Sequence, residues 1–380
     1  FVFISGESSD GKLLKSVLKF GAKGVDKNKN QVSLKGKVAV DWVKSSDSWK
    51  IKTWHTKSMA VMRSKQRMFR NRMTDLFSSK DLQLATRSFH EEKLTEFIKK
   101  NETMLPKSEY GPYFMPESGY QHPAVSVVDI NQDGWDDLFV TSLWAPCQLW
   151  VNQGGKHFTE QARAYGLDVQ ACCTSAMFAD FDNDGDADVF LSRMTDGGRL
   201  YRNLGGFKFE DVTDEMGIAS PGVWGAGCTW ADVNGDGWVD LYLCAFDAPN
   251  RLFMNQEGRG FKDQAKALGL DFKGASMMMA FSDYDLDGDL DGYLLTNRIP
   301  PGEEMKDVRF GLVKGPDGEP IIQPEVMQEY AGIIKYPQGY KKISSGQFDR
   351  LYRNDGGTFT EVGKEAGIRE SEFGLSATWW

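Results

Sequence analysis

Short apolar runs and acidic turns alternate along most of the chain after residue 109. In each unit one apolar run precedes an Asp- and Gly-rich stretch, and a second run follows it. Short runs of β-branched and aromatic residues bounded by Asp, Gly and Asn predict strands joined by tight turns. The runs before the acidic stretches are Ala124–Val128, Ala176–Ala179, Thr229–Ala231 and Met278–Phe281. The runs after them are Leu138–Val140, Val189–Leu191, Leu241–Leu243 and Tyr293–Leu295.

The acidic stretch is a nine-residue motif, Asp-x-Asp/Asn-x-Asp-Gly-x-x-Asp, that occurs four times. It begins at Asp129, Asp180, Asp232 and Asp283, at intervals of 51, 52 and 51 residues. A Leu-aromatic-x-Asn element follows at Leu149–Asn152, Leu200–Asn203, Leu252–Asn255 and Leu351–Asn354. The fourth copy of this element stands much further from its motif than the others, which predicts an insertion at about residues 298–345. Four strands in about fifty residues are typical of a β-propeller blade, so we predict a mainly β fold with propeller blades over 109–380.

The motif has the oxygen-rich chemistry of a calcium loop. Side chains at positions 1, 3, 5 and 9 carry carboxylate or amide oxygens, glycine at position 6 permits a sharp turn, and position 7 can supply its backbone carbonyl. Oxygen ligands without His or Cys select a hard cation, and a flexible loop suits Ca²⁺ better than Mg²⁺. We therefore predict about four Ca²⁺ sites. The candidate ligands are Asp129, Asn131, Asp133, Trp135, Asp137, Asp180, Asp182, Asp184, Asp186, Asp188, Asp232, Asn234, Asp236, Trp238, Asp240, Asp283, Asp285, Asp287, Asp289 and Asp291.

Two other interpretations of the motif must be weighed. An EF-hand begins with the same pattern but needs a Glu at position 12 and flanking helices. Position 12 here is apolar and falls inside a predicted strand, at Val140, Leu191, Leu243 and Leu294, which excludes the EF-hand. The other interpretation is an acidic turn that binds nothing. Mutual repulsion among the carboxylates disfavours it, least for the loop at Asp232, which has only three acids.

These units resemble the FG-GAP/VCBS repeats of calcium-loop β-propellers, the family that includes the integrin α-chain head. The spacing and the Leu-Tyr-Arg-Asn and Gly-Ile elements are more similar to the propeller of the cartilage acidic protein (ASPIC/UnbV-associated) family. The resemblance covers roughly residues 109–380 and implies a secreted, periplasmic or cell-surface protein that binds calcium. It implies no catalytic residues. The chain departs from the pattern in its insertion and in lacking an ASPIC/UnbV segment. Trp379 and Trp380 fall inside a repeat, so we expect the blades to be incomplete at the C-terminus.

The first 108 residues follow different rules. Residues 1–61 alternate as β-hairpins and are weakly similar to the last strands of a cone fold, so we predict a basic, hairpin-rich segment there. Residues 62–108 are predicted to be a basic linker with a helix over 79–100, capped by Ser79 or Asp81. Residues 66–77 resemble the part of the repeat that contains the Leu-aromatic-x-Asn element. This similarity suggests a strand that pairs with the last blade and closes the ring.

Charge changes the picture at the same boundary. The chain as a whole carries a formal charge of −9, but residues 1–108 hold an excess of Lys and Arg while residues 109–380 are acidic. The four acidic loops hold much of the excess of Asp and Glu in residues 109–380. The negative charge therefore indicates metal binding more than it indicates a positively charged partner. For the basic run Arg63–Arg72, a solvated face, or one docking on the acidic blades, is favoured over a nucleic-acid site, because no aromatic interleaving supports the latter. No apolar run approaches the roughly 20 residues of a membrane span.

The remaining chemistry favours a binding protein over an enzyme. No nucleophile, phosphate-loop or zinc motif is found, and the five cysteines form no CxxC; a bridge from Cys147 to Cys172 or to Cys173 would suit an oxidising compartment. We expect a non-catalytic extracytoplasmic scaffold that binds a protein or glycan on the propeller face or the insertion, with no nucleic-acid partner. A subunit of a larger assembly is a further interpretation. The alternative is a polysaccharide-acting hydrolase or lyase, for which the scattered candidates are His122, Glu303, Glu304 and Tyr330.

Overall fold

The computed structural model divides the chain into two compact units, Phe1–Thr74 and Asp75–Trp380. It describes residues 2–9, 13–25, 31–45, 48–64, 72–89, 91–92, 95, 99, 124–206, 208–297, 312–314, 318–322, 331–336, 339–344 and 346–368. Each unit is considered by itself.

The first unit is a four-stranded antiparallel meander, as the hairpin pattern of residues 1–61 predicts. Its strands are β1 (Val2–Ser9), β2 (Leu13–Val25), β3 (Gln31–Ser45) and β4 (Ser48–Ser64), paired in that order. Val38 and Val40 on β3 are almost fully buried, and the Trp42 indole N–H donates to the Ser16 hydroxyl across the strand pair at 2.7 Å. The alternation read from the sequence thus corresponds to one covered face of a sheet.

A short helical segment precedes the blades and corrects two predictions. Residues 73–76 form helix α1 (Met73–Leu76) rather than part of a ring-closing strand over 66–77, while residues 65–71 lie outside the described residues. Helix α2 (Ser79–Ala85) is capped by Ser78, whose hydroxyl accepts the Asp81 N–H at 3.2 Å. The single helix predicted over 79–100 is therefore interrupted after Ala85, although the described residues between 89 and 99 are again helical.

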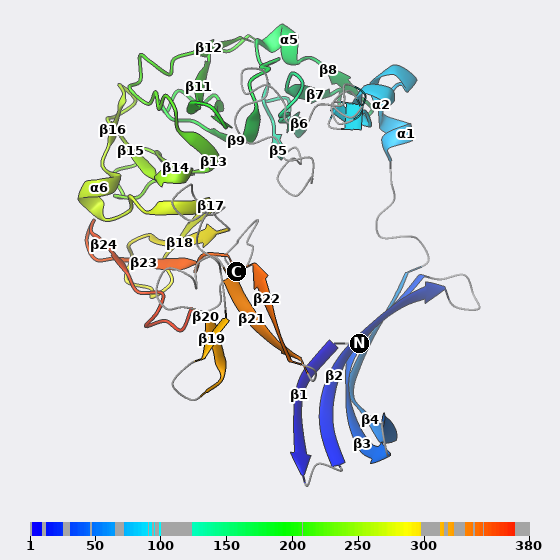
Figure 1. Ribbon diagram of the computed structural model, residues 1–380. Helices are drawn as coiled ribbons and strands as arrows, with labels where there is room; N and C mark the ends of the chain where they lie inside the picture. Colours follow the sequence, from blue (N-terminus) through cyan, green and yellow to red (C-terminus); the bar gives the residue numbers. More distant parts are fainter. Residues whose placement is uncertain are drawn as a thin grey trace. The chain divides into compact units, whose positions relative to one another are not determined.

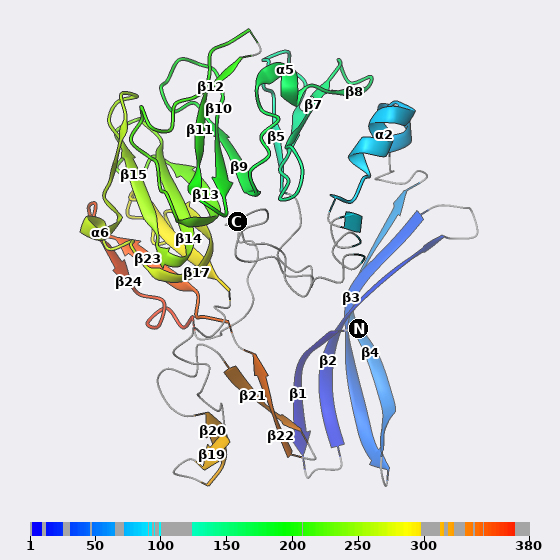
Figure 2. The same ribbon diagram turned by 45° about the horizontal axis from the view of Figure 1, so that its top comes forward.

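Four blades of four antiparallel strands make up the described core of the second unit, and the third and fourth blades are joined into one eight-stranded sheet where the second strand of the third pairs with the first strand of the fourth (Figures 1 and 2). The first comprises β5 (Val125–Val128), β6 (Asp137–Val140), β7 (Gln148–Asn152) and β8 (Phe158–Glu160), with helix α5 (Ala162–Tyr165) after it. The second comprises β9 (Cys173–Ala179), β10 (Asp188–Arg193), β11 (Gly197–Asn203) and β12 (Phe209–Asp211). The third comprises β13 (Trp224–Ala231), β14 (Asp240–Pro249), β15 (Arg251–Asn255) and β16 (Phe261–Asp263), followed by helix α6 (Ala265–Leu268). The fourth comprises β17 (Lys273–Ser282), β18 (Asp291–Thr296), β23 (Arg350–Asn354) and β24 (Phe359–Glu361).

Successive blades pack face to face, so each strand serves two cores. The first strands of the blades, β5, β9, β13 and β17, lie side by side in sequence order. Because neighbouring residues of a strand point to opposite faces, Val189 and Leu191 on β10 pack against the first blade, while Phe190 between them packs against the third. This explains why the second strand of each blade is a continuous apolar run rather than an alternating one.

The predicted insertion is confirmed between β18 and β23. It contains two hairpins among its described residues, β19 (Leu312–Lys314) with β20 (Pro320–Ile322), and β21 (Ala331–Tyr336) with β22 (Gly339–Ser344). Its root is held tightly to the fourth blade, because the Asp349 carboxylate accepts the Tyr293 hydroxyl at 2.8 Å and the Thr296 N–H at 2.7 Å. The blade register therefore resumes after the insertion as if it were absent.

The helical segment covers part of the first blade's outer face. Phe77 packs edge-on against Trp150 and stacks on Phe158, with ring centroids 5.0 and 5.4 Å apart. Between the end of α2 and this blade lies a cavity of about 280 Å³, lined by residues that include Phe89, Trp144 and Gln148. On β5 the cover is incomplete, because Val125 and Val127 are 58 and 63 % exposed, whereas the corresponding strands of the later blades lie against the preceding blade.

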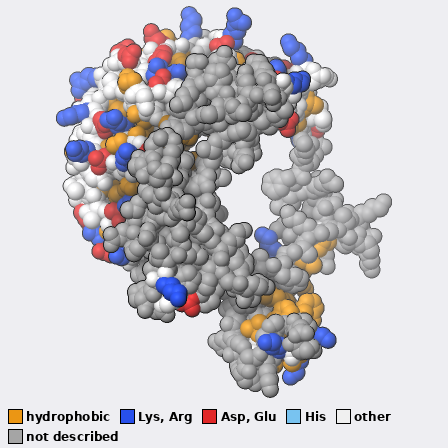
Figure 3. All heavy atoms as spheres, viewed as in Figure 1, with side chains coloured by type: hydrophobic (Ala, Val, Ile, Leu, Met, Phe, Trp, Pro, Cys, Tyr) orange, Lys and Arg blue, Asp and Glu red, His pale blue; other side chains and the backbone are white. Residues whose placement is uncertain are grey.

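Acidic and basic side chains are interspersed over the outer surface of the blades in the view of Figure 3. No helix among the described residues has the length and apolar character needed to cross a membrane.

Replacing the aromatic anchor of the helical segment tests its role. We expect Phe77→Ala to lower the free energy of unfolding by about 1–2 kcal/mol, because it removes two aromatic contacts from a half-buried site. Denaturant unfolding of the whole chain measures the loss, and Lys80→Ala, on the exposed side of α2, serves as the control. Equal stability of the two variants would contradict a stabilising role for the packing of Phe77 on the first blade.

Candidate calcium loops

Each acidic motif forms the hairpin loop between the first and second strands of a blade. The position-1 carboxylate shapes the loop by accepting two backbone N–H groups from positions 5 and 6. In the first loop Asp129 accepts from Asp133 at 3.1 Å and from Gly134 at 2.8 Å. The same two bonds recur at Asp180, Asp232 and Asp283, with distances between 2.9 and 3.1 Å. An Asp is needed at position 1 because both of its oxygens are used by the turn.

Two positions of the loop adopt left-handed backbone conformations. Glycine at position 6 has φ between 86° and 101° in all four loops, and no atom would contact an added Cβ there. Position 4 is also left-handed, with φ 56° at Gln132 and Asn183 and 65° at Leu286, where glycine would be the easier residue. The conserved geometry of position 4 has no matching sequence signal, because four different residues occupy it.

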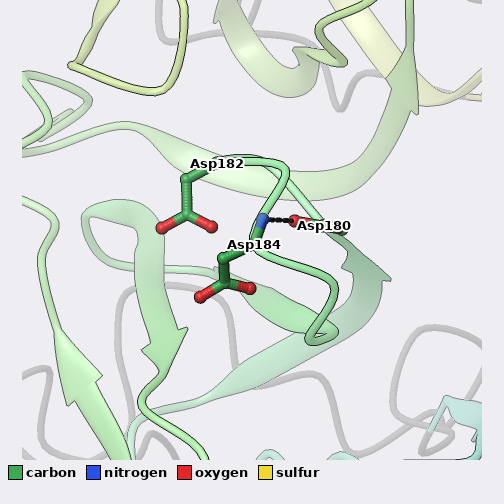
Figure 4. Close-up of side chains that lie close together, drawn as sticks. All are labelled: Asp180, Asp182 and Asp184. Carbon is green, nitrogen blue, oxygen red and sulfur yellow. Dashed lines mark hydrogen bonds between the residues drawn. The ribbon is translucent and has the colours of Figure 1, made fainter.

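The carboxylates of positions 1, 3 and 5 converge in the two loops that have Asp at all three. Ligand oxygens lie within 4.8 Å of one another in the group Asp180, Asp182 and Asp184, and in the group Asp283, Asp285 and Asp287. Figure 4 shows the Asp182 and Asp184 carboxylates on the same side of the loop, while Asp180 is held by the Asp184 backbone N–H. The structure thus brings together the ligands predicted at positions 1, 3 and 5.

The donor set of the second loop fits Ca²⁺. Asp182 Oδ1 is buried without a hydrogen-bond partner beside the other two carboxylates, so an oxygen that has lost its water has no protein donor in return. Burial, followed by the charge of Asp184, raises the pKa of Asp182. A divalent cation among these oxygens would satisfy the orphaned atom and offset the repulsion, and the all-oxygen set matches a hard cation.

The first and third loops have asparagine at position 3 and satisfy themselves to a greater extent. The Asn131 amide donates to Asp133 at 3.3 Å, and the Asn234 amide donates to Asp236 at 2.9 Å. Their amide oxygens accept the position-5 backbone N–H at 3.1 and 3.2 Å. These two loops carry less uncompensated negative charge and are the weaker cation candidates.

The position-9 aspartates form a separate layer beneath these ligands. They are fully buried as the first residues of β6, β10, β14 and β18, and they are outside the converging carboxylate groups: Asp137, Asp188, Asp240 and Asp291. One oxygen of Asp188 accepts the Phe181 N–H at 3.1 Å, and the other accepts the Asn203 N–H at 2.7 Å. Equivalent pairs of bonds form in the other three blades. Each position-9 carboxylate therefore joins its loop to the third strand of the blade.

Burial makes the charge on these aspartates costly. Burial raises the pKa of Asp188 to about 7 and of Asp240 to about 6, against the backbone hydrogen bonds, which lower it. The pKa of Asp137 is raised for the same reason. Positive charge close above would stabilise the ionised form, which is a second feature that suits a cation in the loop.

Position 7 is expected to bind a cation through its backbone carbonyl, so its side chain is free to vary between Trp and Asp. Trp135 and Trp238 lie over Gly155 and Gly258, where an added Cβ would collide with the indole. Asp186 instead accepts the Gln132 amide, and Asp289 accepts the Gly356 N–H at 3.0 Å.

The asparagine of each Leu-aromatic-x-Asn element is a structural residue that we did not assign to the site. Its amide donates to the carbonyl of position 8 in the same blade, as Asn203 does to Ala187 at 3.2 Å. Its oxygen accepts a glycine N–H in the following turn, as in Asn203 with Gly205 at 3.0 Å. The fixed interval between motif and asparagine is the signal that could have revealed this link.

Neighbouring loops are joined by amide side chains. Gln132 donates to the Gly185 carbonyl at 2.6 Å and to the Asp186 carboxylate at 2.9 Å in the next loop. Asn183 reaches the Gly237 carbonyl at 3.3 Å, and Asn255 reaches back to the Phe181 carbonyl at 2.8 Å. The first three loops are therefore physically linked in series.

Comparison with known proteins agrees with this geometry. The family model described as "FG-GAP-like repeat" matches residues 129–191, 180–243 and 232–294. Residues 129–294 are FG-GAP-like repeats. Each matched segment begins at one acidic loop, runs through the next acidic loop, and ends in the strand that directly follows it. The boundaries of the repeat therefore fall at the candidate calcium loops.

The curated relatives show a weaker likeness. The chain is 26 % identical over 140 residues to cartilage acidic protein 1 of Mus musculus and to that of Homo sapiens, covering 36 % of this chain and 21 % of each relative. The match spans about a fifth of those proteins. Among solved structures, "BBS1N in complex with ARL6DN", soaked with mercury or with lead, matches at TM-scores of 0.33 and 0.32 and 12 % identity, covering 63 % of this chain and 68 and 67 % of those chains.

The position-9 carboxylate can be tested without metal. We expect Asp188→Ala to lower the free energy of unfolding by about 2 kcal/mol or more in chelator, because two buried N–H donors lose their acceptor. Glu210→Ala, exposed on β12 of the same blade, should change it by less than about 0.5 kcal/mol. If Asp188→Ala unfolds at the same denaturant concentration as Glu210→Ala, the bracing role is wrong.

Proposed function

We propose that this protein is a non-catalytic, calcium-stabilised binding module that works outside the cytoplasm. The observation that carries the proposal is the convergence of Asp180, Asp182 and Asp184, with a buried oxygen of Asp182 lacking any donor. FG-GAP-like repeats are often extracellular or binding modules, which supports the location and the class of function.

Calcium would act mechanically in this proposal. Bound Ca²⁺ would neutralise the converging carboxylates, while hydrogen bonds of the loop residues hold the loop to its blade and to its neighbours. Position 1 holds the turn, position 9 ties the turn to the third strand, and Gln132 and Asn183 extend the tie to the neighbouring blades. A ligand that binds only the folded state stabilises it by mass action, so the blades would depend on calcium for part of their stability.

The binding surface is assigned to the insertion of the fourth blade. Its root is rigid, since Asp349 and Gln347 bind Thr296 and Ala275 of the blade. Each described hairpin of the insertion is a two-stranded sheet with no third strand among the described residues, and open strand edges can pair with a partner's strand. We infer a protein partner there, with a glycan as the alternative ligand.

The enzyme alternative has less support. Asp129 and Asp188 represent the carboxylates of positions 1 and 9, whose oxygens already accept backbone N–H groups, and Asp182 belongs to the converging group that we assign to calcium. The scattered catalytic candidates His122, Glu303, Glu304 and Tyr330 lie outside the described residues.

Calcium titration of the whole chain tests the proposal. We expect CaCl₂ to raise the melting temperature and chelator to lower it, with a stabilisation of about 2.7 kcal/mol when calcium is a hundredfold above its Kd. The double variant Asp184→Ala, Asp287→Ala should lose most of the response, because each converging group loses one ligand. Glu210→Ala should retain it. A melting temperature that is unchanged by calcium in the wild-type chain would overturn the calcium role.

One arginine should set the relative affinity of the second loop. Arg202 pairs with Asp182 at 3.0 Å, while the corresponding residues of the first and third blades, Val151 and Met254, carry no charge. We expect Arg202→Met to raise the calcium affinity of one site roughly fivefold, because a partly buried positive charge leaves a ligand. Isothermal titration calorimetry measures the change.

A matched control exists in the fourth blade. Arg353 occupies the same place but binds Asp355 at 2.9 Å outside the loop, so Arg353→Met should change the affinity much less. Equal effects of the two substitutions would show that general charge, rather than the Arg202 contact, governs affinity.

A further inference from the structure

Two cysteines meet where the first blade joins the second. Cys147 immediately precedes β7, and Cys173 is the first residue of β9. The Cys147 N–H donates to the Val169 carbonyl at 3.0 Å, and the Cys173 N–H donates to the Ser142 carbonyl at 3.1 Å. These two bonds clamp the backbones on both sides of the pair, so the positions of the two sulfurs are set by the blades.

The two side chains share one buried core. All five cysteines are unbridged in the structure, and Cys147 and Cys173 belong to the same cluster of buried residues. Both side chains are nearly fully buried, at 2 and 1 % exposure, in the core cluster that joins the two blades.

The neighbouring Cys172 is placed differently. It is only partly buried and adopts a left-handed backbone conformation with φ 51°, just before the strand begins. It packs against the separate cluster of Leu143, Trp144 and Met194, whereas Cys173 belongs to the inter-blade core. The structure therefore separates two pairings that the sequence leaves equivalent.

We propose that Cys147 and Cys173 form a disulfide that staples the first blade to the second when the chain meets a low-molecular-weight disulfide oxidant. One cysteine first exchanges with the oxidant, forming a mixed disulfide and releasing one small thiol. The other cysteine then attacks the protein sulfur of that mixed disulfide and releases the second small thiol. Two protein thiols are oxidised, one small disulfide is reduced, and the two protons pass to the released thiols.

The staple would close a loop that contains β7, β8 and α5, the outer half of the first blade. Cross-linking a loop of this length restricts the unfolded chain and stabilises the folded state. Forming the staple requires no calcium, because the disulfide bond joins two sulfurs and involves no loop carboxylate. It would secure the junction of these blades under conditions in which the loops are empty.

Peptide mapping of the intact chain tests the proposal. The folded protein is incubated with oxidised glutathione, its remaining thiols are blocked with iodoacetamide in denaturant, and the non-reduced digest is read by mass spectrometry. We expect a cross-linked peptide joining Cys147 to Cys173, with Cys172, Cys228 and Cys244 alkylated. A cross-link to Cys172 instead, or the alkylation of both Cys147 and Cys173, would overturn the proposal.

Variants and melting curves supply a second measurement. The oxidised wild-type chain should melt roughly 5–10 °C above the same sample after reduction. Cys172→Ser should keep both the cross-link and this difference, whereas Cys173→Ser should lose both. If Cys173→Ser fails to fold, the comparison of oxidised and reduced wild type still decides, and equal melting temperatures there would contradict a stabilising staple.

Discussion

The buried aspartate at position 9 is the interaction on which each blade depends. Its two oxygens hold one N–H from the loop and one from the third strand, while its backbone begins the second strand, so a single side chain registers three parts of the sheet. Keeping this carboxylate ionised costs free energy, because burial removes its water, and the raised pKa of Asp188 reflects that cost. It is retained because a neutral acceptor of the same size cannot accept two N–H groups with both of its heteroatoms. The carboxylates of the candidate cation site act on this charge, because Asp182 and Asp184 both raise the pKa of Asp188. A cation bound by the loop would therefore also favour the ionised form of the buried aspartate.

Packing between blades follows from the same regularity. Strand residues alternate between two interfaces, and each hydrophobic cluster unites the facing sides of two neighbouring blades. Among the described residues no blade has a core of its own, which is the behaviour of repeat proteins, where interfaces between units supply much of the stability. The first blade meets this requirement with Phe77 on one side and the second blade on the other.

Much of this architecture was predictable from the sequence. Fixed intervals between Asp, Gly and Asn predicted the four blades, the loop positions and the place of the insertion, because every copy must repeat the same turn and strand. The helix at 73–76 was not predicted, because Met73–Phe77 resembles a segment of the blade repeat. The cap of the following helix was also misplaced: Ser78, rather than Ser79 or Asp81, is its N-cap and accepts the Asp81 N–H. The contacts of Gln132 were also beyond reach, since they depend on which loop lies next in space. The contact of Arg202 with Asp182 depends on how the third strand lies against the loop of its own blade. The assignment of position 9 as a ligand stays a prediction, whereas its two backbone contacts were missed, although its fixed spacing to the asparagine was visible.

The insertion has a consequence for the order of folding. In the first blade the second and third strands pair residues close in sequence, such as Leu138 with Trp150, whereas the fourth blade must pair Tyr293 with Leu351. Closing the longer loop costs about 1 kcal/mol more in chain entropy, before the entropy of the hairpins themselves. Non-local pairing of this kind slows folding, so the early blades can assemble while the fourth is still open. The hydrogen bonds of Asp349 with Tyr293 and Thr296 then form late and fix the fourth blade after the first three blades have folded.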